Sequence, residues 1–222
     1  HEFIFQDSNL EPPQVVELPK EFKTLTGPKT GEKKKALEYL YSRGVSDLDI
    51  LRWRLGYCDY GEYEGRVIVP SFNTHGKVNY FVARSYTEDW LKYKNPPVSK
   101  NVIFNDLNLD WSFDLTVVEG VFDAIRHENC VPILGSSLGE AHKLFQKICK
   151  NKSEVYLCLD EDAKDKEFYI AKKFMEYGVN CKTVSLAPYS DLAEMPKQEF
   201  LKRKKNADFI TDLHYLHYKL NF

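Results

Sequence analysis

Short apolar runs alternate with longer segments of helical periodicity through the second half of the chain, and this alternation most restricts its fold. The apolar runs lie at residues 115–118, 131–134, 155–159 and 181–186, and the helical patterns lie at 122–128, 139–150 and 165–177. Short uninterrupted apolar runs are typical of strands that are buried on both faces. The pattern therefore predicts βαβ units and an α/β fold, with a parallel sheet covered by helices.

The first half predicts a smaller α+β unit. Amphipathic patterns at 32–44 and 47–55 indicate two helices, and strand-like runs at 66–70 and 78–84 flank a turn sequence typical of a hairpin. Prolines and glycines before residue 32 indicate an extended leader or linker. We therefore expect four segments: a leader at 1–31, a basic α+β subdomain at 32–113, an α/β domain at 114–195 and a helical tail at 196–222.

Composition excludes several classes of protein. The 222 residues are 43% hydrophobic with a net charge of −2, as in ordinary globular proteins, so collagen-like and low-complexity chains are excluded. The longest apolar runs are far shorter than a membrane span, and no signal-peptide pattern is present, so we expect a cytoplasmic protein without a membrane partner. The five cysteines include no CxxC pair, so we expect no zinc in this chain.

Charge is unevenly distributed along the chain. Residues 20–100 carry 15 basic and 10 acidic side chains, whereas the remainder is acidic. This distribution is compatible with a nucleic-acid groove beside a carboxylate site, although a solvated charged surface gives the same pattern.

Acidic residues follow three of the predicted parallel strands. Glu119 directly follows the run at 115–118, with Asp123 one helical turn later; Asp160 and Asp162 follow the run at 155–159, and Asp191 follows the run at 181–186. The carboxyl ends of parallel strands meet at one edge of a sheet, where ligands bind. Oxygen ligands without His or Cys favour Mg²⁺ or Mn²⁺, which predicts phosphoryl or nucleotidyl transfer. Each acid alone is equally typical of a turn or a helix cap.

Two of these segments resemble the TOPRIM motifs of primases, topoisomerases and some nucleases. They are Val-Val-Glu-Gly-Val-Phe-Asp at 117–123 and Leu-Asp-Glu-Asp-Ala at 159–163. In order and approximate spacing, further segments resemble the catalytic core of the DnaG-type primases of bacteria and phages. These segments lie at 36–46, 55–57, 66–70, 82–84, 92–96 and 134–142.

The resemblance implies a TOPRIM parallel-sheet domain after a small α+β subdomain, and a DNA-directed RNA polymerase that makes short RNA primers on single-stranded DNA during replication. It implies Mg²⁺ or Mn²⁺ as cofactor, and nucleoside triphosphates, a single-stranded DNA template and a replicative helicase as partners. Glu119, Asp160 and Asp162 would be the catalytic metal ligands, and Asp123 and Asp191 accessory ones. The residues that would bind nucleic acid or nucleotide are Arg66, Arg84, Lys92, Lys94 and Asn95.

The sequence departs from the family pattern in places. The third acidic motif is commonly Asp-x-Asp, but here Ala193 follows Asp191 at that spacing, and Glu194 is one residue out of register. The family's zinc-binding module is not recognisable. Two alternatives stay open: a TOPRIM nuclease that uses the same acids, and a catalytically impaired adaptor that binds DNA or helicase. A topoisomerase would need a further large domain that carries a tyrosine.

Overall fold

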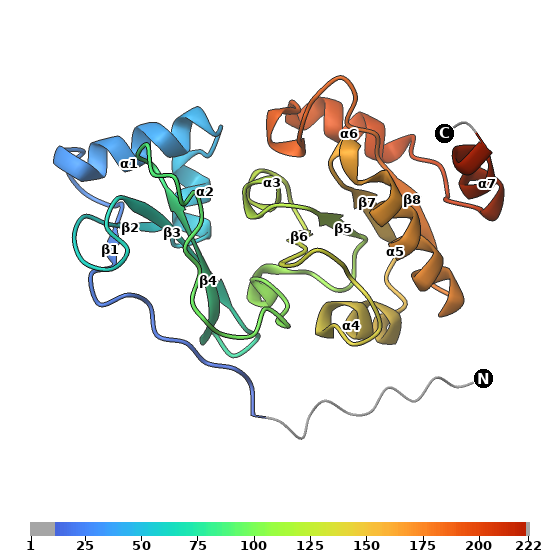
Figure 1. Cartoon of the computed structure of the whole chain (residues 1–222), viewed down its shortest axis with the longest axis horizontal. Helices are drawn as coiled ribbons and strands as arrows, with labels where there is room; N and C mark the ends of the chain where they lie inside the picture. Colours follow the sequence, from blue (N-terminus) through green and yellow to red (C-terminus); the bar gives the residue numbers. More distant parts are fainter. Residues whose placement is uncertain (1–11, 221–222) are drawn as a thin grey trace. The chain divides into compact units, whose positions relative to one another are not determined.

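The computed structural model describes residues 12–220 and divides the chain into two compact units. The N-terminal unit spans Pro13–Asn108, and the C-terminal unit begins at Leu109 (Figure 1). The boundary lies five residues before the expected start of the catalytic domain at 114. Each unit has its own sheet and its own buried core.

The sheet of the N-terminal unit is antiparallel, with its strands in the order β1-β2-β3-β4. The strands are β1 (Lys23–Thr24), β2 (Gly56–Cys58), β3 (Arg66–Phe72) and β4 (Val78–Ser85). The predicted hairpin joins β3 to β4, and Asn73 closes its turn by accepting hydrogen bonds from the backbone N–H groups of His75 and Lys77, each at 3.0 Å. Gly76 has a φ of +71°, which favours glycine at this position.

Two helices complete the fold of this unit. Helix α1 (Gly31–Ser42) buries Ala36, Leu37 and Leu40, as its periodicity predicts. Helix α2 (Asp47–Arg52) begins with a capping box in which the Ser46 hydroxyl accepts from the Asp49 backbone N–H and the Asp49 carboxylate accepts from the Ser46 N–H. Both predicted helices are present, although α2 is shorter than its pattern.

The segment before α1 packs onto the sheet, whereas the sequence predicts a leader or linker. The backbone N–H of Val16 donates to the carbonyl of Val78 at 2.9 Å, and β1 pairs with β2. Val16, Leu18 and Phe22 pack against a buried cluster that includes residues of β2, β3 and β4. Apolar side chains between the prolines hold the segment in place, because burying them stabilises the unit.

The sheet of the C-terminal unit is parallel throughout, with its strands in the order β6-β5-β7-β8. The strands are β5 (Leu115–Val118), β6 (Cys130–Pro132), β7 (Val155–Cys158) and β8 (Cys181–Thr183). The helices between them are α3 (Val121–Arg126), α4 (Lys143–Asn151) and α5 (Lys164–Glu176). Every residue of β5 and β7 is buried, so both faces of the central strands are covered. The predicted α/β fold is confirmed.

Helix α4 begins later than its pattern predicts. His142 folds back on Gly139, accepting from its backbone N–H at 3.0 Å through Nδ1 and donating its own backbone N–H to the Gly139 carbonyl at 2.9 Å. This turn holds residues 139–142 outside the helix.

All five cysteines of the chain are free and buried, the usual position of a cysteine that packs as a small apolar residue.

The tail of the chain forms two helices, where the sequence predicts one, and both belong to the C-terminal unit. Helix α6 (Lys197–Lys205) buries Phe200, and helix α7 (Asp212–Leu220) follows it (Figure 1). Between them the chain passes beside β8, where the Ile210 N–H donates to the Cys181 carbonyl at 2.8 Å. No helix within residues 12–220 is both long enough and apolar enough to span a bilayer.

Candidate active site

The carboxylates of Glu119 and Asp160 project from the same edge of the parallel sheet. Strands β5 and β7 are neighbours, and their register pairs Val118 with Cys158. Glu119 follows the first of these residues directly, and Asp160 comes two residues after the second. The structure therefore brings together the two acids that the strand pattern predicts, at the edge where parallel sheets bind ligands.

Further carboxylates contribute to the electrostatic environment of Asp160. Burial raises its pKa to about 6, and the negative charges of Glu119, Asp191 and Asp162 add to this increase. Asp162 lies exposed in the short helix η3 (Glu161–Ala163), which follows β7. The four carboxylates thus form one region of negative potential, and their repulsion favours a bound cation or a bound proton.

Asp123 connects two elements of this edge. It is buried, and its two oxygens accept hydrogen bonds from the backbone N–H groups of Gly120 at 2.9 Å and Ala193 at 3.0 Å. Burial raises its pKa to about 7, and the nearby charge of Asp191 raises it further. Asp123 therefore joins the start of α3 to the short helix η4 (Leu192–Glu194).

Asp191 caps the same short helix. Its Oδ1 accepts from the backbone N–H of Glu194 at 3.0 Å, and the Glu194 carboxylate accepts from the N–H of Ser190 at 3.2 Å. The out-of-register Glu194 therefore closes a turn onto Ser190. Of the third acidic motif, Asp191 is the residue whose charge reaches Asp123 and Asp160.

Lys166 is a residue of this edge that the sequence analysis does not identify. Its Nζ lies 2.9 Å from Oε1 of Glu119, and its side chain is only 17% exposed. The other oxygen of Glu119, Oε2, is buried and has no hydrogen-bond partner in the described part of the chain. The sequence shows only that a lysine follows Asp162 by four residues. Many helices carry a lysine in such a position, so this spacing does not predict a contact with Glu119.

These side chains partly fit a divalent metal ion. Carboxylate oxygens are the ligands that Mg²⁺ and Mn²⁺ prefer, and the buried Oε2 of Glu119, which has no hydrogen-bond partner among the described residues, is suited to bind such an ion. Between residues 12 and 220, however, no three His, Cys, Asp or Glu side chains form a ready-made metal site. The donor chemistry therefore fits, whereas the ligands are not preassembled around one point.

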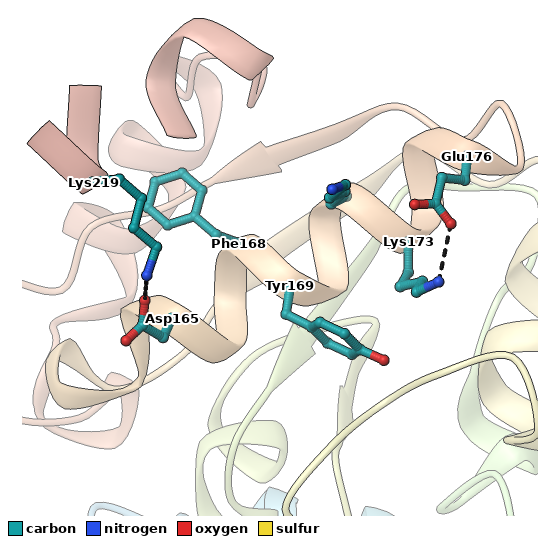
Figure 2. A pocket seen from close by; sticks show the side chains of 7 residues that line it. Asp165, Phe168, Tyr169, Lys173, Glu176 and Lys219 are labelled. Carbon is teal, nitrogen blue, oxygen red and sulfur yellow. Dashed lines mark hydrogen bonds and ion pairs between the residues drawn. The ribbon is translucent and has the colours of Figure 1, made fainter. Parts of the chain in front are cut away.

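A cavity of about 380 Å³ lies elsewhere on the C-terminal unit, along one face of α5. Figure 2 shows Phe168 and Tyr169 from α5, with an ion pair of 2.8 Å between Asp165 and Lys219 and another of 3.1 Å between Lys173 and Glu176. None of the predicted acids lines this cavity. It is separate from the candidate active site.

In the N-terminal unit, Arg84 and Lys92 lie on and beside β4. The Arg84 Nε donates to the Tyr39 hydroxyl at 3.0 Å, and its guanidinium lies 4.6 Å from the centre of the Tyr93 ring. Lys92 is exposed, and its ammonium group has no ion-pair partner among residues 12–220. Arg84 is thus held in a fixed position, whereas Lys92 is available to an anionic ligand.

Lys94 and Asn95 are partly engaged within the same unit. Lys94 donates to the Glu62 carbonyl at 3.0 Å and lies 3.3 Å from the Glu62 carboxylate. Asn95 accepts from the Ala83 backbone N–H at 3.2 Å through its side-chain oxygen. Asn95 therefore helps to hold its own segment against β4.

Arg66 is buried, although the sequence places it among the nucleic-acid-binding residues. Its guanidinium forms an ion pair with Asp89 and donates to the Leu91 carbonyl at 2.9 Å, and its side chain is only 4% exposed. The Asp89 carboxylate also accepts from the Leu91 N–H at 2.9 Å. Arg66 thus stabilises the loop that leads to Lys92, and the structure does not present it on the surface.

Comparison with known proteins relates this chain to primases. It is 24% identical over 217 residues to the DNA primase of Thermotoga maritima, an alignment that covers 75% of this chain and 38% of the relative. The chain spans about two fifths of the length of these curated relatives. No protein-family model matches it.

Solved structures of primases share the fold. The zinc-binding and RNA polymerase domains of the Aquifex aeolicus primase superpose with a TM-score of 0.70 at 21% identity, over 80% of this chain and 57% of that one. A DnaG primase catalytic domain bound to single-stranded DNA gives a TM-score of 0.69 at 21% identity, over 84% of this chain and 74% of that one.

The parallel sheet with acids at its carboxyl edge, together with a small antiparallel unit, defines an α/β core. More particularly, the chain has the fold of the DnaG-type primase catalytic core, and its curated relatives are DNA primases.

Proposed function

We propose that this chain is the catalytic core of a DNA primase, a DNA-directed RNA polymerase that synthesises short RNA primers on single-stranded DNA. The observation that carries the proposal is the position of Glu119 and Asp160 side by side at the edge of a sheet whose fold matches DnaG-type cores. That match covers 84% of this chain, more than either unit alone contains, which supports a polymerising core over an isolated TOPRIM domain.

Glu119, Asp160 and Asp162 are the residues we assign to Mg²⁺ or Mn²⁺. When bound, the ion would neutralise a nucleoside triphosphate and lower the pKa of the attacking 3′-hydroxyl. Asp123 and Asp191 would fix the geometry of this sheet edge. Asp123 connects α3 to the short helix η4, and Asp191 caps η4. A bound cation stabilises the ionised form of these carboxylates most, because they repel one another in its absence.

Arg84, Lys92 and Lys94 would bind the phosphates of the template or the nucleotide. Lys92 is free to do so, whereas Lys94 would first release Glu62. Asn95 would contribute by ordering the segment that carries both lysines. The solved DnaG domain bound to single-stranded DNA supports a single-stranded template as the partner. Nucleoside triphosphates, a replicative helicase and action in the cytoplasm follow from the same proposal.

Incorporation of labelled ribonucleotides on single-stranded DNA tests the proposal. Assays with Mg²⁺ or Mn²⁺, with and without a short primer, should give metal-dependent products that Glu119→Gln abolishes. The matched control is Asp165→Asn, because Asp165 is an exposed acid on α5 that pairs with Lys219 outside the site. Product that persists in Glu119→Gln would contradict the assignment, and shortened template would indicate a TOPRIM nuclease.

A DNA-binding adaptor of low catalytic power is the second candidate. It is favoured by the ion pair between Lys166 and Glu119, and because no three acids within residues 12–220 are preassembled around a metal position. Such an adaptor would bind single-stranded DNA without incorporating nucleotides at any metal concentration, so the same assay with a binding measurement distinguishes it from the primase.

A further inference from the structure

Lys166 and Glu119 come from different elements of the C-terminal unit and meet at its candidate active site. Glu119 follows β5, and Lys166 lies in the first turn of α5, 47 residues later. Their charged atoms are 2.9 Å apart, and the exposed fractions of the two side chains are 17% for the lysine and 34% for the glutamate. The pair is thus partly shielded from water, where an ion pair is screened less than at the surface.

A charged lysine at position 166 is unfavourable by itself, so the ion pair with Glu119 is needed to stabilise it. A positive charge in the first turn of a helix opposes the helix dipole, and a lysine that is largely buried loses hydration and side-chain freedom. The positive charge of Lys164, in the same turn, is compensated by two carboxylates: its Nζ lies 3.1 Å from Glu167 and 3.8 Å from Glu161. For Lys166, the ion pair found among the described residues is the one with Glu119.

We propose that Lys166 is a positioning residue that acts as a resident cation of the carboxylate cluster. It holds Oε1 of Glu119 and supplies a positive charge that a metal ion would otherwise supply. As a result the site is partly neutralised before metal arrives and takes up a divalent ion more weakly than its acids alone would. The inference rests on the proposed metal site and adds to it a residue that sets the affinity of that site.

Titration of the protein with Mn²⁺, followed by calorimetry, tests the inference without requiring turnover. Lys166→Gln should bind Mn²⁺ about tenfold more tightly, because the Glu119 oxygen that the ammonium group holds becomes free to bind the ion. Lys166→Arg, which keeps the charge, should bind with the affinity of the parent. Lys172→Gln is the matched control, because it makes the same charge change at an exposed position of the same helix, beside the cavity that is separate from the site.

A second pair of variants tests whether Lys166 acts through Glu119. In a Glu119→Gln background, changing Lys166 to Gln should alter Mn²⁺ affinity by less than about threefold, since the carboxylate that it holds is gone. An equal effect in both backgrounds would reduce Lys166 to a distant charge and overturn the role proposed for the ion pair. Thermal unfolding of each variant checks that the fold is retained, and Lys166→Arg keeps the test informative should Lys166→Gln unfold.

The outcomes separate this inference from the function on which it rests. If the parent binds Mn²⁺ and Lys166→Gln binds it equally or more weakly, Lys166 has only a structural role and the inference is wrong. If none of the variants binds Mn²⁺ at millimolar concentrations, the proposed metal site itself is wrong, and this inference is wrong with it.

Discussion

The carboxylate of Asp123 accepts a hydrogen bond from the backbone N–H of Ala193, 70 residues later in the chain, at 3.0 Å. Its second oxygen accepts from the N–H of Gly120 at 2.9 Å. One buried side chain therefore fixes the position of η4 relative to the start of α3. This places Asp191, two residues before Ala193, at the same edge of the sheet as Glu119 and Asp160.

Asp123→Asn should destabilise the C-terminal unit. An amide has one accepting oxygen, so one of the two backbone N–H groups would face an NH₂ group inside the protein, at a cost of about 1–3 kcal/mol in the free energy of unfolding. Urea denaturation of the metal-free protein measures this cost. Asp165→Asn serves as the control, because Asp165 is exposed, and equal stability of the two variants would contradict the role of Asp123.

The stability of the metal-free protein should fall as the pH rises from about 4 to about 7. The pKa of Asp160 is raised to about 6 and that of Asp123 to about 7, so the folded protein holds protons that the unfolded chain has already released. The stabilisation is therefore full below the unfolded pKa of about 4 and is lost as each folded pKa is passed.

Denaturation in the presence of a chelator, at a series of pH values, measures this slope. Asp160→Asn should flatten it, because the variant has no carboxyl group to titrate at that position. A metal-free protein that is more stable at pH 8 than at pH 5 would contradict the prediction.

Lys92→Ala should weaken binding of single-stranded DNA and lower its salt dependence by about one counterion. The ammonium group of Lys92 is exposed and lacks an ion-pair partner among residues 12–220, so its removal costs the fold little. Fluorescence anisotropy of a labelled oligonucleotide across a salt series measures both quantities. Lys77→Ala, an exposed lysine in the β3–β4 hairpin, is the control, and equal losses in the two variants would remove Lys92 from the interface.

Arg66→Met should destabilise the N-terminal unit by about 2–3 kcal/mol, because Asp89 and the Leu91 carbonyl lose a charged donor. Urea denaturation of this variant measures the loss. DNA binding by folded Arg66→Met should change only as far as the loop before Lys92 is disordered. A variant that is fully stable yet defective in DNA binding would instead return Arg66 to the nucleic-acid-binding residues.

Much of the fold could be predicted because its signals are local. The buried strands β5 and β7 are continuous apolar runs, and α1 and α5 keep a helical period, so each element is recognisable within its own residues. Strand β2 has only three residues and β1 only two, which is too short for an alternating pattern. Both strands exist because neighbouring strands pair with them.

The site could be predicted only in part, for a similar reason. Glu119 and Asp160 follow directly from the ends of parallel strands, whereas the contact between Lys166 and Glu119 depends on how α5 packs against the sheet. The interior position of Arg66 is equally a tertiary property, because an arginine at the start of a strand can point to either face. Residue type and spacing carry no information about such contacts.

The pairing of β1 with β2 has a practical consequence for how this chain is shortened. Without Lys23 and Thr24, the backbone groups of β2 that they satisfy would form an open strand edge, and such edges pair with other molecules. Val16, Leu18 and Phe22 would leave with the same segment and uncover the apolar surface on which they pack. A chain that begins at α1 would therefore tend to self-associate. The smallest N-terminal unit that stays monomeric includes residues 16–24, although their composition is typical of a linker.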